Sequence, residues 1–248
     1  QFTKLACQVG DVGAHLAVFP WVHVIFAVKP VGGGVLRDHQ QFFNASLDQL
    51  FRLTHHRLLW SRYTSPPHVW DDAEFGPYYN AYGGRRGALF SSRRRRTEQD
   101  ARAVKAPSPT FNCVGPAGVG TGSLAGMRML HHLADTTHIW PFGDASYPTA
   151  SLVLVEIFPS YYFAAAGIRP VNQQQAALPA LNQALGFYGS APLLDNSHLG
   201  GPDADDADAL IAAAALRHHA ADKACWQVPD EAVLEGWIFG VKSGSQKP

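Results

Sequence analysis

Several carboxylate side chains stand together at the start of an alanine-rich segment, Asp203-Ala-Asp-Asp-Ala-Asp-Ala-Leu-Ile-Ala-Ala-Ala-Ala-Leu. Like charges this close repel one another, so the cluster must be solvated, cap a helix or share a cation. At the start of a helix, aspartates accept hydrogen bonds from free backbone N–H groups and suit the helix dipole. A shared divalent cation would instead make them metal ligands. The pattern predicts a helix from Asp203 to about His219, with both roles open to its first turn.

Glu156 is a second carboxylate in an unusual setting, the apolar segment Ser151-Leu-Val-Leu-Val-Glu-Ile-Phe-Pro-Ser. The segment is apolar and Pro159 ends it, which predicts a strand from Ser151 to Phe158. A charge in so apolar a run needs a partner, because burying an unpaired charge is costly. Taken with the aspartate cluster, Glu156 favours a functional role for these carboxylates over helix capping alone.

The composition is typical of one globular domain and indicates no charged partner. The chain has 248 residues, 46% of them hydrophobic and 16% charged, which is enough to bury a large core. Twenty basic and twenty acidic residues give a formal net charge of zero, so no overall field favours nucleic acid or an anionic membrane. No apolar run reaches the roughly 18 residues that span a bilayer. The first residue is Gln1 rather than Met, which we interpret as a truncated or processed N-terminus.

Cysteine and histidine patterns disfavour several other kinds of site. Cys7, Cys113 and Cys225 show no CxxC spacing, so they indicate neither a disulfide framework nor a zinc motif, and we expect a reducing, cytoplasmic location. The histidines include three adjacent pairs, whose side chains point in different directions on a helix, and no HExxH motif. No GxSxG motif occurs and no Cys stands next to a His, which disfavours nucleophilic acyl transfer.

Expected strands and helices alternate along the rest of the chain, which predicts an α/β or α+β domain. A strand is expected over 18–28, a turn over 30–34 and a helix over 39–60, where apolar residues recur at helical spacing. Four further elements are expected in chain order: an ordered loop over 63–87, a helix over 172–185, a loop over 195–202 and a short strand within 226–241.

Four consecutive arginines precede a further carboxylate: Arg93, Arg94, Arg95 and Arg96, followed by Glu98. Such a run is usually a solvated face. A guanidinium fork also matches phosphate oxygens, so contact with a phosphate is the alternative. Glu98 is either a salt-bridge partner of the arginines or a carboxylate of a site.

A glycine-rich loop, Thr110 to Ser123, precedes apolar residues at helical spacing. The loop has Thr121 where a phosphate-binding P-loop needs Lys, and no GxGxxG follows a clear strand, so nucleotide binding is disfavoured. A tight loop whose following helix meets one phosphate with its free N–H groups is the milder interpretation.

Six segments carry a resemblance through their order and spacing: Arg95-Arg-Thr-Glu98, 114–126, Ile139-Trp-Pro-Phe142, Val155-Glu-Ile-Phe-Pro-Ser160, Asp205-Asp-Ala-Asp-Ala-Leu210 and Glu235-Gly-Trp-Ile-Phe239. Together they resemble an uncharacterised bacterial domain-of-unknown-function family that is grouped as predicted nucleases with the RNase H-like fold. The resemblance covers about residues 75–241, and residues 1–74 are weakly assigned. It implies that residues 1–248 form a single RNase H-like domain, α/β in class, in which helices flank a mixed sheet.

The resemblance also implies a site. RNase H-like enzymes hold divalent metal ions with carboxylates on the first strand, near the end of the fourth strand and at the start of the last helix. Glu156 matches the fourth-strand carboxylate, and Asp205 with Asp208 match the helix pair. These three would bind Mg²⁺ or Mn²⁺, hard cations that suit oxygen ligands, with Glu98 as a further catalytic carboxylate. Two ions about 3.5–4 Å apart would activate water and stabilise the leaving oxygen of a phosphodiester. The substrate-binding residues would be Arg93, Arg94, Arg95 and Arg96.

The first-strand aspartate of that family is not found before Val28, where Asp11 is the nearby carboxylate and lacks a strand context. The N-terminal strand of the fold is therefore missing or atypical, and three functions stay open. The first is a metal-dependent nuclease or phosphodiesterase, which is inactive if the first ligand is absent. The second is a non-catalytic nucleic-acid or nucleotide-binding module. The third is a hydrolase that uses Glu156 as a general base. The substrate and the oligomeric state stay open, and no membrane partner is expected.

Overall fold

The computed structural model describes residues 24–28, 77, 79–81, 85–90, 94–114, 119–120, 123, 130, 138–142, 152–168, 178–195 and 205–244. Residues 24–28, 81, 85, 152 and 205 are described by their backbone alone. Contacts divide the chain into two compact units, one of residues 1–29, 96–107 and 137–248, the other of residues 30–95 and 108–136. The expectation of one domain over 1–248 stays a prediction.

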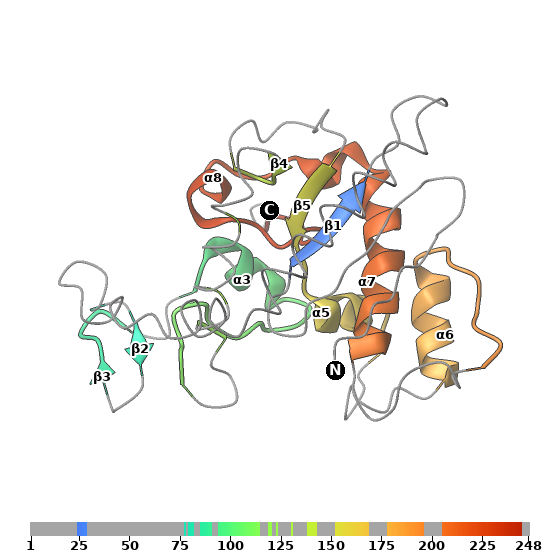
Figure 1. The fold of residues 1–248 in the computed structure, drawn as a ribbon, viewed down its shortest axis with the longest axis horizontal. Helices are drawn as coiled ribbons and strands as arrows, with labels where there is room; N and C mark the ends of the chain where they lie inside the picture. The colour runs from blue at the N-terminus through green and yellow to red at the C-terminus, as the bar shows by residue number, and fades with distance from the viewer. Residues whose placement is uncertain are drawn as a thin grey trace, which may run out of the picture. The chain divides into compact units, whose positions relative to one another are not determined.

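The first unit contains a mixed sheet with strand order β1-β5-β4 (Figure 1). The strands are β1 (Val24–Val28), β5 (Leu152–Glu156) and β4 (His138–Ile139). β1 is antiparallel to β5, with Val24 opposite Glu156, whereas β4 is parallel to β5. The described part of the chain is therefore mixed α/β. The expected strand over 151–158 is confirmed by β5, whose buried Val153, Leu154 and Val155 explain its apolar sequence. β1 confirms the C-terminal part of the strand expected over 18–28, and the earlier part lies outside the described residues.

Three helices follow β5 and pack together. They are α5 (Pro159–Ala165), α6 (Leu178–Phe187) and α7 (Asp205–Ala220), and both α5 and α6 pack against α7 (Figure 1). β5 ends at Glu156, and Pro159 begins α5, because its missing N–H is not needed in a first helical turn. Every residue from 211 to 216 is buried, as expected for a helix with neighbours on several sides. Small alanine side chains allow that close approach.

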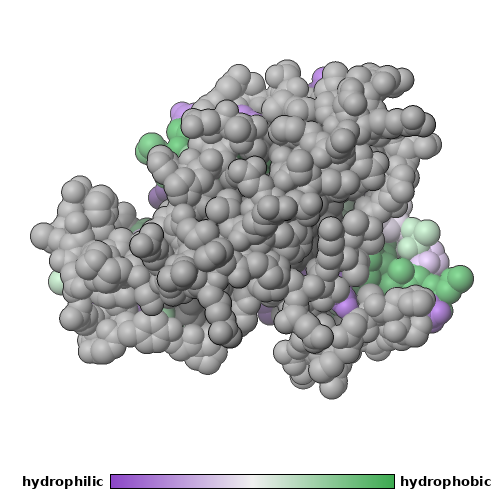
Figure 2. Space-filling view, viewed as in Figure 1, coloured by the Kyte–Doolittle hydropathy of each residue, from purple (hydrophilic) through white to green (hydrophobic). Residues whose placement is uncertain are grey.

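α7 confirms the helix expected from Asp203 to about His219, within the described residues. α6 confirms the second half of the helix expected over 172–185 and extends it to Phe187, while residues 172–177 lie outside the described part. At the end of α6 and beyond it, apolar side chains reach solvent: Phe187 is 55% exposed and Leu194 is 97% exposed, and Figure 2 shows hydrophobic colour there.

The C-terminal segment closes the core of this unit. It contains the 3-10 helix η3 (Lys223–Trp226) and the short helix α8 (Ala232–Glu235), followed by an isolated bridge between Ile238 and Glu156 where a short strand was expected. Trp140, Trp226 and Phe239 pack edge to face with ring centroids 4.7–5.9 Å apart. Such pairs stabilise beyond the area they bury.

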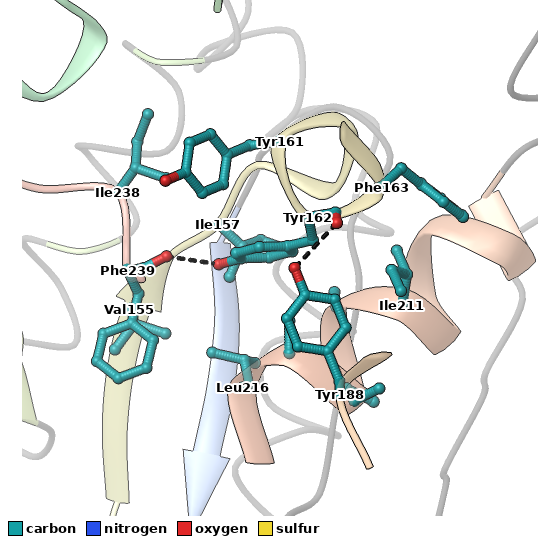
Figure 3. Close-up of a cluster of buried hydrophobic side chains, with 14 of the residues drawn as sticks. Val155, Ile157, Tyr161, Tyr162, Phe163, Tyr188, Ile211, Leu216, Ile238 and Phe239 are labelled. Carbon is teal, nitrogen blue, oxygen red and sulfur yellow. Dashed lines mark hydrogen bonds between the residues drawn. The ribbon is translucent and has the colours of Figure 1, made fainter. Parts of the chain in front are cut away.

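Two tyrosines tie the helices to this segment (Figure 3). The Tyr162 hydroxyl donates to the carbonyl of Phe239 at 2.8 Å, and the Tyr188 hydroxyl donates to the carbonyl of Tyr162 at 2.9 Å. All three residues are buried, so these bonds satisfy polar groups that would otherwise be costly in the core. α5, α6 and the C-terminal segment are therefore joined through one buried network.

The second unit is described only in short pieces. β2 (Asn80–Ala81) pairs antiparallel with β3 (Arg85–Arg86), and Asn80 also bridges Asn112. The rings of Tyr79 and Phe111 pack edge to face at 5.3 Å. The ordered loop expected over 63–87 is thus partly a two-stranded ladder where it is described. The helix expected over 39–60 and the turn over 30–34 lie outside the described residues, as does most of the loop over 195–202.

Candidate functional site

Glu156 is the last residue of β5, the middle strand of the mixed sheet, and its side chain is half-buried. Its backbone carbonyl accepts a hydrogen bond from the Phe239 N–H at 2.8 Å. Because β4 and β5 are parallel, Glu156 lies at their carboxyl end, the edge at which α/β sheets usually bind ligands. Burial raises the pKa of Tyr162 well above its ordinary value, with neighbouring Tyr188, Tyr161 and Glu156 as further causes. Glu156 therefore lies within electrostatic range of the buried tyrosine network.

Glu98 lies in the first turn of α3 (Arg96–Ala101) and is only 1% exposed. The neighbouring Thr97 is also buried, and its hydroxyl accepts a hydrogen bond from the Ile238 N–H at 3.0 Å. Ile238 thus bonds to α3, and the next residue, Phe239, bonds to the end of β5. The helix that carries Glu98 and the strand that ends in Glu156 are therefore joined through the same two-residue segment.

The aspartates at the start of α7 differ in their surroundings. Asp206 is buried at 5% exposed and Asp208 is half-buried, while Asp205 is described by its backbone alone. Asp206 was not among the residues expected at the site. The sequence holds a signal for it: Asp206, Ala209 and Ala213 follow the i, i+3, i+7 spacing of one helix face, and all three are buried.

The candidate metal ligands were Glu156, Asp205 and Asp208. Among the described side chains, no group of three or more His, Cys, Asp and Glu is arranged to hold a metal ion. Because the side chain of Asp205 is not among them, the three-carboxylate set stays a prediction. The donor chemistry fits Mg²⁺ or Mn²⁺, since all three side chains offer carboxylate oxygens.

The arginine run is divided between the two units. Arg93 lies outside the described residues, Arg94 and Arg95 are half-buried, and Arg96 is exposed. The Arg96 guanidinium forms an ion pair with Asp100 at 3.2 Å, and the Arg96 N–H donates to the Glu235 carboxylate at 2.7 Å. Arg96 is therefore held by Asp100 and Glu235, both of its own unit.

Gly120 gives the glycine-rich loop a structural explanation. Its N–H donates to the Asn112 carbonyl at 2.7 Å. A Cβ at this position would lie 2.6 Å from the Thr110 carbonyl oxygen and 2.7 Å from the Cys113 sulfur, so no other residue fits. The close approach of two backbone segments therefore accounts for this glycine without a bound phosphate.

A cluster that the sequence did not indicate lies where α7 meets η3. The Cys225 sulfur lies 3.7 Å from Nδ1 of His219 and 3.7 Å from Oδ2 of Asp222. Burial lowers the pKa of His219 to about 4, with neighbouring His218 and Lys242 as further causes. Burial, followed by the Asp222 carboxylate, raises the pKa of Cys225 to about 11. At neutral pH the cluster is a neutral imidazole beside a neutral thiol.

The observation that no Cys stands next to a His holds along the chain but not in space. The sequence shows only that His219 and Cys225 are six residues apart, and the turn between α7 and η3 brings them together. The neutral pair differs from an activated nucleophile, which needs a thiolate.

Comparisons with family models, with curated proteins and with solved structures found no match to this chain. Within the described residues, no helix combines the length and the apolar character that a membrane crossing requires.

Proposed function

We propose that the protein is a metal-dependent nuclease or phosphodiesterase of the RNase H-like class. The observation that carries the proposal is the position of Glu156, a half-buried carboxylate at the carboxyl end of the middle strand of a mixed sheet. Glu98 supports it, because its helix is hydrogen-bonded to the segment that also bonds Glu156. A carboxylate in so apolar a run is costly to bury unless it is paired or coordinates a metal ion.

In this proposal Glu156, Asp205 and Asp208 hold Mg²⁺ or Mn²⁺, and Glu98 assists them. The bound ions would supply Lewis-acid activation of water and stabilisation of the leaving oxygen. The protein residues would hold the ions and fix the orientation of the substrate. Arg94, Arg95 and Arg96, with Arg93 beyond the described residues, would bind the phosphate backbone.

The test is hydrolysis of single-stranded and duplex DNA and RNA, and of a small activated phosphodiester, with Mg²⁺ or Mn²⁺. Glu156→Gln keeps the shape of the side chain and removes its charge, so activity should fall by more than about a hundredfold. The matched control is Glu231→Gln, an exposed carboxylate that makes no capping hydrogen bond at α8.

Metal-dependent cleavage that survives in Glu156→Gln would contradict the assigned role of Glu156. Salt-dependent binding of nucleic acid without any cleavage would favour the non-catalytic module instead, because its affinity would rest on phosphate contacts alone.

A further inference from the structure

The formal net charge of zero is a sum over two oppositely charged units. The unit of residues 30–95 and 108–136 contains ten basic residues, all of them arginine, and six acidic residues, which leaves a formal net charge of +4. The other unit contains ten basic and fourteen acidic residues, including every lysine of the chain, which leaves −4. Charge asymmetry within one chain indicates an anionic partner for the basic unit, either nucleic acid or an anionic membrane.

The use of arginine without lysine in the basic unit favours one kind of anion. A guanidinium is planar, so it matches phosphate oxygens with two parallel hydrogen bonds and stacks on flat rings, whereas an ammonium acts as a point charge. An anionic membrane attracts lysine and arginine alike, because it acts on them through its surface potential. Arginine alone therefore favours a partner that offers both phosphates and flat rings, which is nucleic acid.

One described arginine of this unit, Arg86 at the end of β3, lies over an aromatic ring. Its side chain is exposed, and its guanidinium carbon lies 5.2 Å from the centroid of the Phe90 ring. Backbone hydrogen bonds hold the turn between them, since the Phe90 N–H donates to the Gly87 carbonyl at 3.0 Å and the Gly87 N–H donates to the Tyr79 carbonyl at 2.9 Å. Because Phe90 is buried, the guanidinium rests on the protein on one side and meets solvent on the other.

We propose that the basic unit binds single-stranded nucleic acid, with an unpaired base stacked on the Arg86 guanidinium and with Arg94 on the phosphate backbone. An unpaired base offers its flat face to an arginine, whereas the bases of a duplex are stacked on one another. Arg94 belongs to the same unit and is half-buried, so part of its side chain reaches the surface. The inference rests on the proposed function for its phosphodiester substrate, and it names the class of that substrate.

The experiment is a titration of the full chain into a fluorescent single-stranded oligonucleotide, in a chelator so that no metal-dependent cleavage occurs. We expect saturable binding that weakens as salt rises and that is tighter than binding to a duplex of the same length. Arg86→Lys keeps the charge but loses the flat guanidinium, so the Kd should rise about tenfold while the salt dependence stays the same. Arg94→Gln should lower the slope of log K against log salt by about 0.7, the value of one phosphate contact on a single strand.

Arg102→Gln is the matched control, because Arg102 is an exposed arginine of the other unit and the substitution removes the same charge. It should leave the Kd and the salt dependence unchanged. Glu156→Gln should also bind like wild type, which separates binding from catalysis. Circular dichroism checks that each variant is folded.

The inference is overturned if folded wild type does not bind the single strand, if it binds the duplex equally or more tightly, or if folded Arg86→Lys binds like wild type. Binding to anionic phospholipid vesicles without binding to the oligonucleotide would overturn it in favour of a membrane partner. Tight binding of the single strand without cleavage in Mg²⁺ or Mn²⁺ would uphold it and contradict the proposed function alone.

Discussion

The two ends of α7 differ in how their chemistry is assembled. At the first turn, Asp205, Asp206 and Asp208 are neighbours along the chain, so their charges are visible in the sequence. At the last turn, His219 meets Tyr162, Tyr188 and Cys225, which come from other elements. The aspartate cluster is thus a feature of the local sequence, whereas the surroundings of His219 are made by tertiary contacts.

The two ends of α7 also differ in the side chains that pack and bond to the rest of the unit. In the first turn of α7, Ala207 is buried and offers little side chain to pack. In the second half, Leu216 is buried, and Arg217 donates to the Gly189 carbonyl at 2.6 Å and to the Ser190 hydroxyl at 2.9 Å. We therefore expect the end from Leu216 to Ala220 to contribute more to the free energy of unfolding than the first turn does.

The largest effect should come from truncating Leu216. Leu216→Ala leaves a cavity in the core and should lower the free energy of unfolding by about 2–5 kcal/mol. In the first turn of the helix, Ala207→Gly should cost about 1 kcal/mol, chiefly through helix propensity. Urea unfolding of the two variants gives both free energies of unfolding. Equal decreases would contradict the expectation that the C-terminal end contributes more.

Acid should destabilise the C-terminal end through His219. Its pKa is about 4 in the folded protein, below the ordinary value of 6.5. The unfolded chain therefore binds the proton first, so stability is complete above pH 6.5 and falls as the pH drops toward 4, by up to about 3 kcal/mol. Unfolding of wild type and His219→Gln in a chelator at pH 7.5, 5.5 and 4.5 isolates this contribution from the carboxylates. Parallel pH profiles for the two proteins would show that His219 does not titrate between the two states.

Gly240→Ala should lower the free energy of unfolding, because Gly240 lies against His219 at the C-terminal end of α7. The glycine has φ of +81°, and the added methyl would meet the His219 ring at 2.6 Å. Overpacking and backbone strain together should cost about 1–3 kcal/mol. Gly186→Ala is the control, because a Cβ there meets no atom within 4 Å and the residue lies in α6, where alanine favours the helix by about 0.5–1 kcal/mol. A neutral Gly240→Ala would mean that the His219 ring is not held against this backbone.

The smallest effect concerns the N-terminal end. In a chelator, Asp208→Asn removes one of several neighbouring negative charges and should leave stability unchanged or raise it by a few tenths of a kcal/mol. If Asp208 acts only through the helix dipole, the substitution should instead cost about 0.3–1 kcal/mol. Thermal melts with and without Mg²⁺ distinguish the two, because the variant should also gain less from the metal than wild type does.

Patterns within single segments predicted much of the fold. The apolar run ending at Pro159 predicted β5, and the alanine-rich run predicted α7, because each depends on local periodicity and on residues that end an element. The start of α3 and the tie from Thr97 to Ile238 were not predictable, since 141 residues separate the partners. The RNase H-like assignment stays a prediction.

The candidate site was predictable to a similar extent. Glu156 was identified because a charge in an apolar strand is unusual, and the structure places it at the carboxyl end of the middle strand. Asp206 could have been found from helical spacing alone, whereas the approach of Cys225 to His219 required the turn between α7 and η3. Pairing of distant residues depends on tertiary contacts that single-segment patterns do not contain.

The most direct test of the central claim is isothermal titration calorimetry of the full chain with Mg²⁺ and with Mn²⁺ at neutral pH. Because the claim rests on the Glu156 carboxylate, wild type and the Glu231→Gln control should bind the metal with the same affinity, and Glu156→Gln should show no saturable heat. A metal present at a hundredfold excess over its Kd should also stabilise wild type by about 2.7 kcal/mol. Equal binding by wild type and Glu156→Gln, or no binding by wild type, would contradict the account.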